Sequence, residues 1–198
     1  NSGPIGMVKF DQATLHDVRS VTKSVVSMLF GIAMANGAIK GLDIAVLDFF
    51  PEYKDLQTAE RRQITLRHLL SMTSGLRWDE STYPYTDRRN SEIAMDIADD
   101  PIRYALEQPL ESSPGSQFRY NGGSVALIAE ILSRATKMSL EDFARQALFA
   151  PLGITQFEWY KDARGVPYAA SGLRMLPRDM ATLGRLMLEK GAQGGRQI

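Results

Sequence analysis

Ser20 and Lys23 are the residues whose types and spacing point most directly to chemistry. A serine hydroxyl is a weak nucleophile at neutral pH and needs a neighbouring base to take its proton. A lysine amine serves as that base where burial among apolar residues disfavours its charged form. At the first turn of a helix, the Ser-x-x-Lys spacing places both side chains on one face. The pair therefore predicts a serine nucleophile with a lysine base.

The start of a helix gives Ser20 two further advantages. The positive end of the helix dipole lies near its oxygen, and its backbone N–H can donate to a developing oxyanion. The pattern alone is weak, because 15 serines and 7 lysines give about half a match by chance. Its position is more informative, since this single match opens the most apolar helix predicted in the chain. A capping serine beside a surface lysine is the alternative that pattern and context leave open.

Composition excludes several other classes of site. The 198 residues carry 23 Lys plus Arg and 23 Asp plus Glu, so no net field favours nucleic acid or an anionic membrane. The absence of cysteine removes disulfides, thiolate metal sites and cysteine nucleophiles, and leaves the redox compartment open. His16 and His68 are the only histidines, and no His-x-x-x-His spacing occurs, so a zinc site is not expected. His68 lies in an apolar stretch and is interpreted as structural.

The ends of the chain and one apolar run indicate whether it is part of a longer protein and whether it carries a signal peptide or a membrane span. The sequence begins at Asn1 and stops after Gly194-Gly195-Arg196-Gln197-Ile198, which suggests part of a longer protein. The run from Val25 to Ile39 is shorter than the roughly 20 residues that a membrane span needs, and it lies inside the chain. We therefore predict a buried helix with no signal peptide and no membrane span. Bacterial periplasm and cytoplasm both stay open as locations.

Apolar periodicity and capping residues predict a mostly helical chain with few strands. Residues 7 to 19 are expected to be an extended lead-in, and residues 76 to 90 a long aromatic loop of the kind that covers a binding cleft. The expected helices and strand, with Pro, Gly and Ser as boundary signals, are as follows: helices over 20–36, 66–71, 101–107, 123–135, 139–149 and 177–190, a short apolar element over 42–50, and a short strand over 157–160.

The segment Arg19-Ser20-Val21-Thr22-Lys23-Ser24 resembles the nucleophile motif of penicillin-recognising serine hydrolases, the class C β-lactamase branch with its esterases and peptidases. Other segments are similar to later landmarks of that family and occur in the family's order over most of residues 15 to 198. They are Leu66 to Leu76, Pro114 to Asn121, Pro151 to Ile154, Ser171 to Leu173 and Arg178 to Ala181. Each match is weak alone, whereas the ordered set is specific.

The resemblance implies a second catalytic residue, Tyr120, because Pro114 to Asn121 matches the segment that carries the family's Tyr-x-Asn motif. A phenol near Ser20 and Lys23 can relay the nucleophile's proton to the leaving group. A core aromatic next to Phe118 is the alternative outside that match.

Two departures from the family pattern stand out. Gly122 occupies the third position of Tyr-x-Asn, so the substrate-holding amide is missing there, and Asn121 is the candidate to replace it. Gly122-Gly123 fits the esterase and amidase relatives better than a site tuned to β-lactams. The third family motif, Lys-Thr-Gly or His-x-Gly on a strand at the sheet edge, does not occur within these residues.

The nucleophile region and the aromatic loop look most like the 6-aminohexanoate-dimer hydrolase branch, whose members cleave small linear amides and esters. By that similarity, Tyr85 is a candidate lid residue that contacts substrate. The family fold is α/β, a helix-flanked antiparallel sheet plus a helical domain. The chain is expected to be a partial domain of this kind, mostly helical and without the C-terminal strands. It would comprise a lead-in and nucleophile helix (1–40), a mainly helical region (41–170), and a return segment with a final helix (171–198).

The function expected from these features is hydrolysis of a small ester or amide through an acyl-enzyme on Ser20, without a metal or cofactor. A lactam or a small linear amide also falls within that class, and the oligomeric state is open. A non-catalytic homologue or fragment that binds a peptide or cell-wall ligand is the principal alternative. A plain helical interaction domain with a chance Ser-x-x-Lys is the third hypothesis, and the ordered matches disfavour it.

Overall fold

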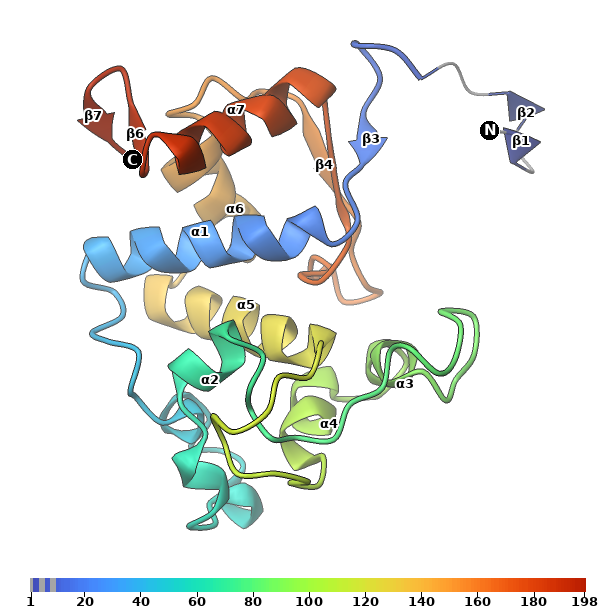
Figure 1. The fold of residues 1–198 in the computed structure, drawn as a ribbon, viewed down its shortest axis with the longest axis vertical. Coiled ribbons are helices and arrows are strands. Elements are labelled where there is room, and N and C mark those ends of the chain that lie inside the picture. Colours follow the sequence, from blue (N-terminus) through green and yellow to red (C-terminus); the bar gives the residue numbers. More distant parts are fainter. Residues whose placement is uncertain (1, 4–5, 8–9) are drawn as a thin grey trace.

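The structure is a computed structural model that describes residues 2–3, 6–7 and 10–198. Helices dominate, and the strands are short (Figure 1). The α-helices are α1 (Val21–Ala35), α2 (Leu66–Leu70), α3 (Ser91–Asp96), α4 (Pro101–Glu107), α5 (Gly122–Thr136), α6 (Leu140–Ala144) and α7 (Pro177–Leu188). The strands are β1 (Ser2–Gly3), β2 (Gly6–Met7), β3 (His16–Asp17), β4 (Phe157–Trp159), β5 (Leu173–Met175), β6 (Ala192–Gln193) and β7 (Arg196–Gln197).

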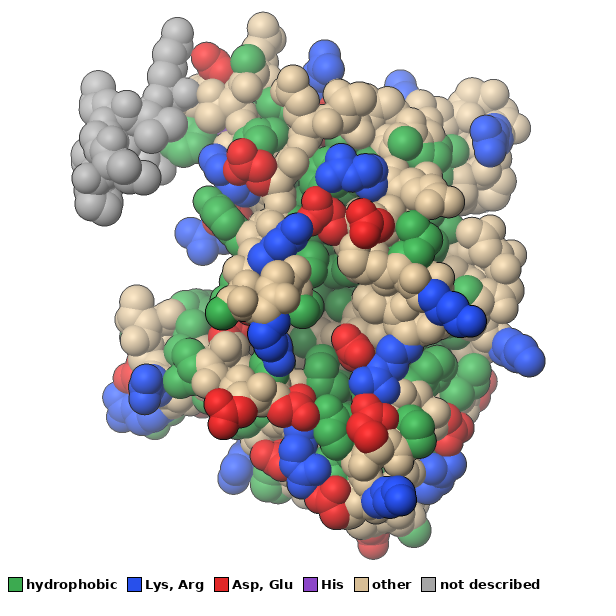
Figure 2. Space-filling view, turned by 180° about the vertical axis from the view of Figure 1, so that it is seen from behind, with side chains coloured by type: hydrophobic (Ala, Val, Ile, Leu, Met, Phe, Trp, Pro, Cys, Tyr) green, Lys and Arg blue, Asp and Glu red, His purple; other side chains and the backbone are tan. Residues whose placement is uncertain are grey.

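Short helical turns connect these elements. Three are 3₁₀ turns, η1 (Val46–Phe49), η2 (Lys54–Leu56) and η3 (Arg61–Gln63), and the π turn η4 (Arg145–Phe149) continues α6. In the described part of the chain, no helix is long and apolar enough to cross a membrane. On the face seen in Figure 2, basic and acidic side chains are interspersed rather than gathered by sign.

A three-stranded antiparallel sheet holds the start of the nucleophile helix. Its order is β3-β5-β4, so the central strand comes from the end of the chain and one edge strand from the beginning. His16 pairs with Met175, and Glu158 pairs with Arg174 on the other side of β5. Elsewhere, β6 and β7 form a hairpin through Gly194 and Gly195, which both have positive φ as a tight hairpin turn requires.

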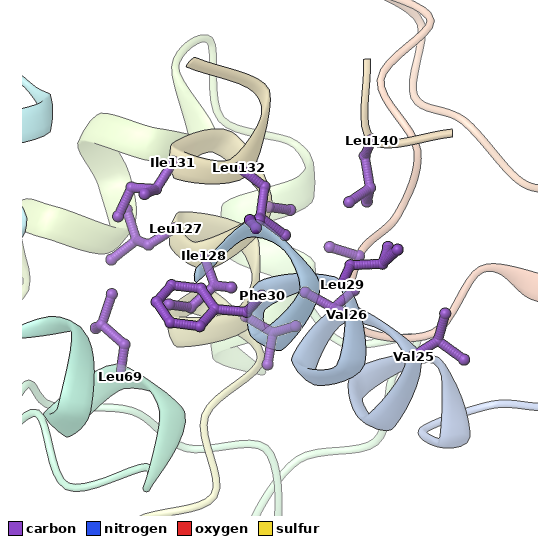
Figure 3. Close-up of a cluster of buried hydrophobic side chains, with 14 of the residues drawn as sticks. Val25, Val26, Leu29, Phe30, Leu69, Leu127, Ile128, Ile131, Leu132 and Leu140 are labelled. Carbon is purple, nitrogen blue, oxygen red and sulfur yellow. The ribbon is translucent and has the colours of Figure 1, made fainter. Parts of the chain in front are cut away.

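The core lies between α1 and α5, with α2 closing one end (Figure 3). The buried side chains meeting there are Val25, Val26, Leu29 and Phe30 of α1, Leu69 of α2, and Leu127, Ile128, Ile131 and Leu132 of α5. Burying a side chain of this size contributes about 1.5–3 kcal/mol. In Figure 1, α1 runs between α5 and α2 on one side and α6 and α7 on the other, which explains why its sequence is apolar nearly all round.

The periodicity located most helices to within a residue or two. The expected 3.6-residue patterns over 20–36, 66–71, 101–107 and 123–135 correspond to α1, α2, α4 and α5. The strand over 157–160 is β4, and residues 76–90 contain no helix or strand longer than an isolated bridge at Leu76.

The expected helix over 139–149 divides into α6 and a π turn, and the element over 42–50 is only the turn η1. Neither α3 nor β5 was expected, because both are short and mixed in polarity. The lead-in contains β3, and its residues 8 and 9 lie outside the described ranges.

Candidate active site

Ser20 lies at the junction between β3 and α1, where the backbone turns sharply. The Val18 amide donates to the Leu173 carbonyl at 3.0 Å and so continues the β3–β5 pairing to the edge of the turn. Arg19 then adopts φ 48°, a left-handed conformation that is uncommon outside glycine. The buried Thr22 hydroxyl donates to the Arg19 carbonyl at 2.7 Å and accepts from the Leu173 amide at 3.3 Å. These contacts hold an unfavourable turn and leave Ser20 exposed at the first turn of α1.

Three predicted residues converge at this turn. The Tyr120 hydroxyl donates to Ser20 Oγ at 2.7 Å, and Lys23 Nζ donates to the same oxygen at 3.3 Å. Lys23 Nζ also donates to the Ala170 carbonyl at 2.7 Å and lies 4.9 Å from the centroid of the Tyr120 ring. Tyr120 as a residue is 39% exposed, so it is not buried in the core. The geometry therefore joins a hydroxyl, an amine and a phenol within hydrogen-bonding range.

Tyr120 is positioned by the segment that leads into α5. The Arg119 amide donates to the Met72 carbonyl at 2.8 Å, and the Gly115 amide donates to the Thr73 carbonyl at 2.7 Å. These two bonds attach residues 115–119 to the turn that follows α2. The Arg119 guanidinium also donates to the Trp78 carbonyl at 3.2 Å. The segment that carries the phenol is thus held from both sides.

Asn121 has a structural role in this arrangement. Its side chain is buried, and its oxygen accepts from the Ser124 amide at 2.8 Å, which makes it the N-cap of α5. The Asn121 oxygen, expected as a substitute for the family's substrate-holding amide, is thus engaged by the helix. Contact between Asn121 and a substrate stays a prediction that this geometry does not favour.

Residues 79–90, here called the lid loop, arch beside Tyr120. The Asp79 carboxylate accepts from the Ser81 and Thr82 amides, each at 2.9 Å, and the amide and hydroxyl hydrogen bonds from these residues lower its pKa to about 2. Asn90 is fully buried; its amide group donates to the Tyr83 carbonyl at 2.8 Å and its oxygen caps α3. The two ends of the loop are therefore anchored by side chains of the loop itself.

Tyr85 extends from the lid loop over a cavity next to the predicted site. The cavity has a volume of about 300 Å³ and is lined by the lid loop together with Trp78, Arg119 and Tyr120. The Tyr85 hydroxyl donates to Glu80 at 2.9 Å, while just over half of the residue stays exposed. Tyr85 therefore borders this cavity, and its role as a lid residue that contacts substrate stays a prediction.

Both histidines make hydrogen bonds within the fold, and His68 was the one interpreted as structural. His68 Nδ1 accepts from the Thr65 amide at 3.2 Å in a capping box that starts α2. His16 lies on β3, and its ring nitrogen is 3.2 Å from the Asp11 carbonyl. Within the described residues, no cluster of three or more His, Asp or Glu side chains is arranged to hold a metal.

A family model described as beta-lactamase matches residues 6–198. The chain belongs to the beta-lactamase family. Among curated relatives, Protein flp of Staphylococcus aureus strain COL is 24% identical over 148 residues, which are 75% of this chain and 28% of that protein. Monacolin J acid methylbutanoyltransferase of Aspergillus terreus is 33% identical over 112 residues, 56% of this chain and 27% of the relative. The chain therefore spans less than a third of the length of these relatives.

Solved structures share the beta-lactamase family fold. A Bacillus anthracis protein provisionally assigned as a 6-aminohexanoate-dimer hydrolase aligns with a TM-score of 0.80 at 22% identity, over 97% of this chain and 52% of that one. EstCE1, described as a hydrolase with promiscuous acyltransferase activity, aligns with a TM-score of 0.74 at 19% identity, over 97% and 62%. The expected α/β fold class is confirmed, with about half of the first of these structures represented here.

Three features of this member of the beta-lactamase family escaped the sequence analysis. They are the Ala170 carbonyl that holds Lys23, and the carboxyl groups of Glu80 and Glu92, which are buried close to Tyr120 and Gly122. No sequence pattern identifies a particular backbone carbonyl. The sequence contains an acidic residue in the aromatic loop and another after a capping asparagine. Whether the two meet in space depends on the path of the chain.

A second, larger cavity of about 450 Å³ lies behind the carboxyl groups. It is bounded by α3, α4, α5 and residues 162–170, and includes Glu92, Asp96 and Ala170 in its lining. Burial raises the pKa of Asp96 to about 6, and the charges of Asp162 and Glu80 act in the same direction. Ser20 is not among the residues that line either cavity, whereas its neighbour Tyr120 lines the smaller one.

Proposed function

We propose that the protein is a serine hydrolase of small esters or amides, with Ser20 as nucleophile and Lys23 and Tyr120 managing its proton. The observation that carries the proposal is the double contact at Ser20 Oγ, 2.7 Å from the Tyr120 hydroxyl and 3.3 Å from Lys23 Nζ. A nucleophile and its base within this range are the geometric signature of covalent catalysis. Membership of the beta-lactamase family supports the same class of reaction.

The proposed reaction has two stages. Ser20 Oγ attacks the carbonyl carbon of the substrate, and its proton passes to the deprotonated Lys23 amine or Tyr120 phenolate along one of the two hydrogen bonds. The leaving alcohol or amine then takes a proton from the same group, and an ester between Ser20 and the acyl group remains. Water attacks that ester and gives up a proton to the base, which passes it to the departing Ser20 oxygen, so that the acid and free Ser20 are released.

Two features of the fold support this sequence of steps. In the described part of the chain, the Ser20 amide donates to no acceptor, so it is available to an oxyanion at the start of α1. The bond from Lys23 Nζ to the Ala170 carbonyl fixes the amine beside Ser20 despite the flexible lysine stem. Preorganised positioning of this kind replaces solvent reorganisation during the reaction.

The proposal is tested by covalent labelling. A fluorophosphonate, or a p-nitrophenyl ester under burst conditions, should add one acyl or phosphonyl mass to the intact protein. Ser20→Ala should abolish the adduct, and Ser24→Ala, one turn along the same helix, should retain it. Tyr120→Phe and Lys23→Met should slow labelling by about 10²- to 10⁴-fold, the usual value of a positioned proton-transfer group. A folded parent protein that forms no adduct at any pH would exclude the hydrolase and favour a non-catalytic ligand-binding homologue.

Acyl transfer to an alcohol is a second candidate, since two similar proteins are described as an acyltransferase and as a hydrolase with acyltransferase activity. The two activities share the acyl-enzyme and differ in what attacks it. Adding a primary alcohol during ester turnover separates them. A transferase yields the new ester at the expense of the acid, whereas a strict hydrolase yields acid alone.

A further inference from the structure

Glu80 and Glu92 form a buried pair of carboxyl groups under the start of α5. Glu80 belongs to the lid loop and Glu92 to α3, and both are less than a tenth exposed. Glu80 Oε1 accepts from the Gly122 amide at 2.6 Å and from the Trp78 indole at 2.5 Å. Its other oxygen accepts from the Tyr85 hydroxyl at 2.9 Å. One carboxyl group thus connects Trp78, Tyr85 and the first residue of the helix that follows Tyr120.

The two carboxyl groups meet in the space that Gly122 leaves empty. A Cβ at position 122 would lie 2.9 Å from Glu80 Oε1 and 2.9 Å from Glu92 Oε2. Any side chain there would therefore collide with both groups. The space beside the Gly122 backbone is thus occupied by two carboxyl groups that come from other segments of the chain.

Two buried carboxylates this close do not both ionise at neutral pH, because their mutual repulsion is little screened. Burial raises the pKa of Glu92 to about 8, and the charge of Glu80 and a hydrogen bond between the two groups act in the same direction. Of the other charged groups facing Glu92, Lys23 opposes this change and Asp96 adds to it. At pH 7 Glu92 is therefore mainly protonated and able to donate to Glu80.

We propose that Glu80 and Glu92 act as a proton-dependent clasp, which holds the lid loop against the start of α5 and thereby positions Tyr120 beside Ser20. Loss of the shared proton places two negative charges under Gly122 and removes the bond between the lid loop and α3. Repulsion between the two carboxylates then displaces Glu80 from the Gly122 amide, so the lid loop no longer holds the start of α5. The clasp stands on the contacts of Glu80 and on its meeting with Glu92 beside Gly122, whereas its effect on turnover rests on the proposed function.

Trp78 reports on the clasp without any reaction, because its indole donates directly to Glu80. The chain has two tryptophans, so 5-fluorotryptophan gives two ¹⁹F resonances, and Trp159→Phe assigns them. The Trp78 resonance should titrate between pH 6 and 10 with a midpoint near the pKa of Glu92. Glu92→Gln, which donates to Glu80 at every pH, should remove that titration. Glu60→Gln, an exposed change elsewhere, should leave it intact.

The same variants test the positioning of Tyr120 through a pH profile. In the wild type, the rate of labelling by a fluorophosphonate should fall about tenfold from pH 7 to pH 9 as Glu92 ionises. In Glu92→Gln the decrease should be less than about twofold, and in Glu60→Gln it should match the wild type. A merely structural loss would lower the rate at both pH values and leave their ratio unchanged.

The outcomes separate the two proposals. A Trp78 titration that persists unchanged in Glu92→Gln, or that is missing from the wild type, overturns the clasp whether or not the protein is labelled. A clasp titration in a protein that is never labelled retains the clasp and overturns the hydrolase. Equal pH ratios in wild type and Glu92→Gln overturn the link from the clasp to Tyr120.

Discussion

Gly122 has no side chain, and this leaves room beside its backbone for the carboxyl groups of Glu80 and Glu92. The φ of Gly122 is not positive, so steric space and not backbone conformation is what the glycine provides. The atoms that a Cβ would meet belong to two buried carboxyl groups that already have partners, and they have little room to move aside. A single methyl group therefore probes the whole arrangement.

Gly122→Ala should lower the free energy of unfolding by about 1–3 kcal/mol, the usual cost of overpacking a buried site. Chemical denaturation at pH 7 measures it. Gly184→Ala is the matched control, because that glycine also lies in a helix, α7, and a Cβ there would meet nothing within 4 Å. The control should raise stability by about 0.5–1 kcal/mol, since alanine is the better helix former. A Gly122→Ala protein as stable as the wild type would contradict the packing described for the pair.

Asn90 determines how the lid loop joins α3. Its oxygen accepts from the Glu92 amide at 3.0 Å, and its amide group reaches back to the Tyr83 carbonyl. Asn90 therefore caps α3 and also anchors the lid loop. The order of the lid loop and the position of Glu92 depend on this one side chain.

Asn90→Ala should release the lid loop, because the cap and the partner of the Tyr83 carbonyl are lost together. Trypsin cleavage after Arg88 or Arg89, both exposed in the lid loop, should accelerate about five- to tenfold, as a loss of about 1–1.4 kcal/mol in local stability implies. Mass spectrometry of the products identifies the cut. Asn36→Ala, at the exposed C-cap of α1, should leave the rate at this site unchanged. An unaltered cleavage rate in Asn90→Ala would show that the loop is held by other contacts.

The stability of the whole molecule should respond to pH through its buried acids. The pKa of Glu92 rises to about 8 and that of Asp96 to about 6, both first by burial. Such groups bind protons more tightly in the folded state, so their contribution is complete below the pKa of the unfolded chain and is lost as pH rises through the folded value. Asp79, with a pKa of about 2, acts in the opposite sense, and its contribution is lost as pH falls toward that value.

The free energy of unfolding should therefore be highest in mildly acid solution and should decrease between about pH 5 and pH 9. Denaturant titrations at pH 5, 7 and 9 measure the slope. In Glu92→Gln the decrease should be smaller, because the group no longer titrates, whereas Glu60→Gln should follow the wild type. A wild-type protein that becomes more stable from pH 5 to pH 9 would contradict the state assigned to these acids.

Local signals were sufficient for most of the helices and for the Ser20–Lys23 pair. The apolar residues of α1, the Asp100-Pro101 start of α4 and the Ser139 cap of α6 all act within one or two helical turns. The same range includes Ser20 and Lys23, which are three residues apart on one helix. A pattern that spans only a few residues predicts contacts between residues equally close in the chain. The helix starts and the Ser20–Lys23 contact lie where that pattern predicts them. Tyr120 required the resemblance as well, since an isolated tyrosine has no local signature.

Only the tertiary structure decided what surrounds Ser20. Tyr120 lies 100 residues from Ser20 in the chain, and Ala170 lies 147 residues from Lys23. Glu80 and Glu92 meet under Gly122 because α5 packs on α1 and α3, and no period within the sequence encodes that contact. The sequence by itself determined that a helix would open with a serine and a lysine on one face. The packing of distant segments determined which phenol, carbonyl and carboxyl groups that serine would meet, because those positions depend on the path of the backbone.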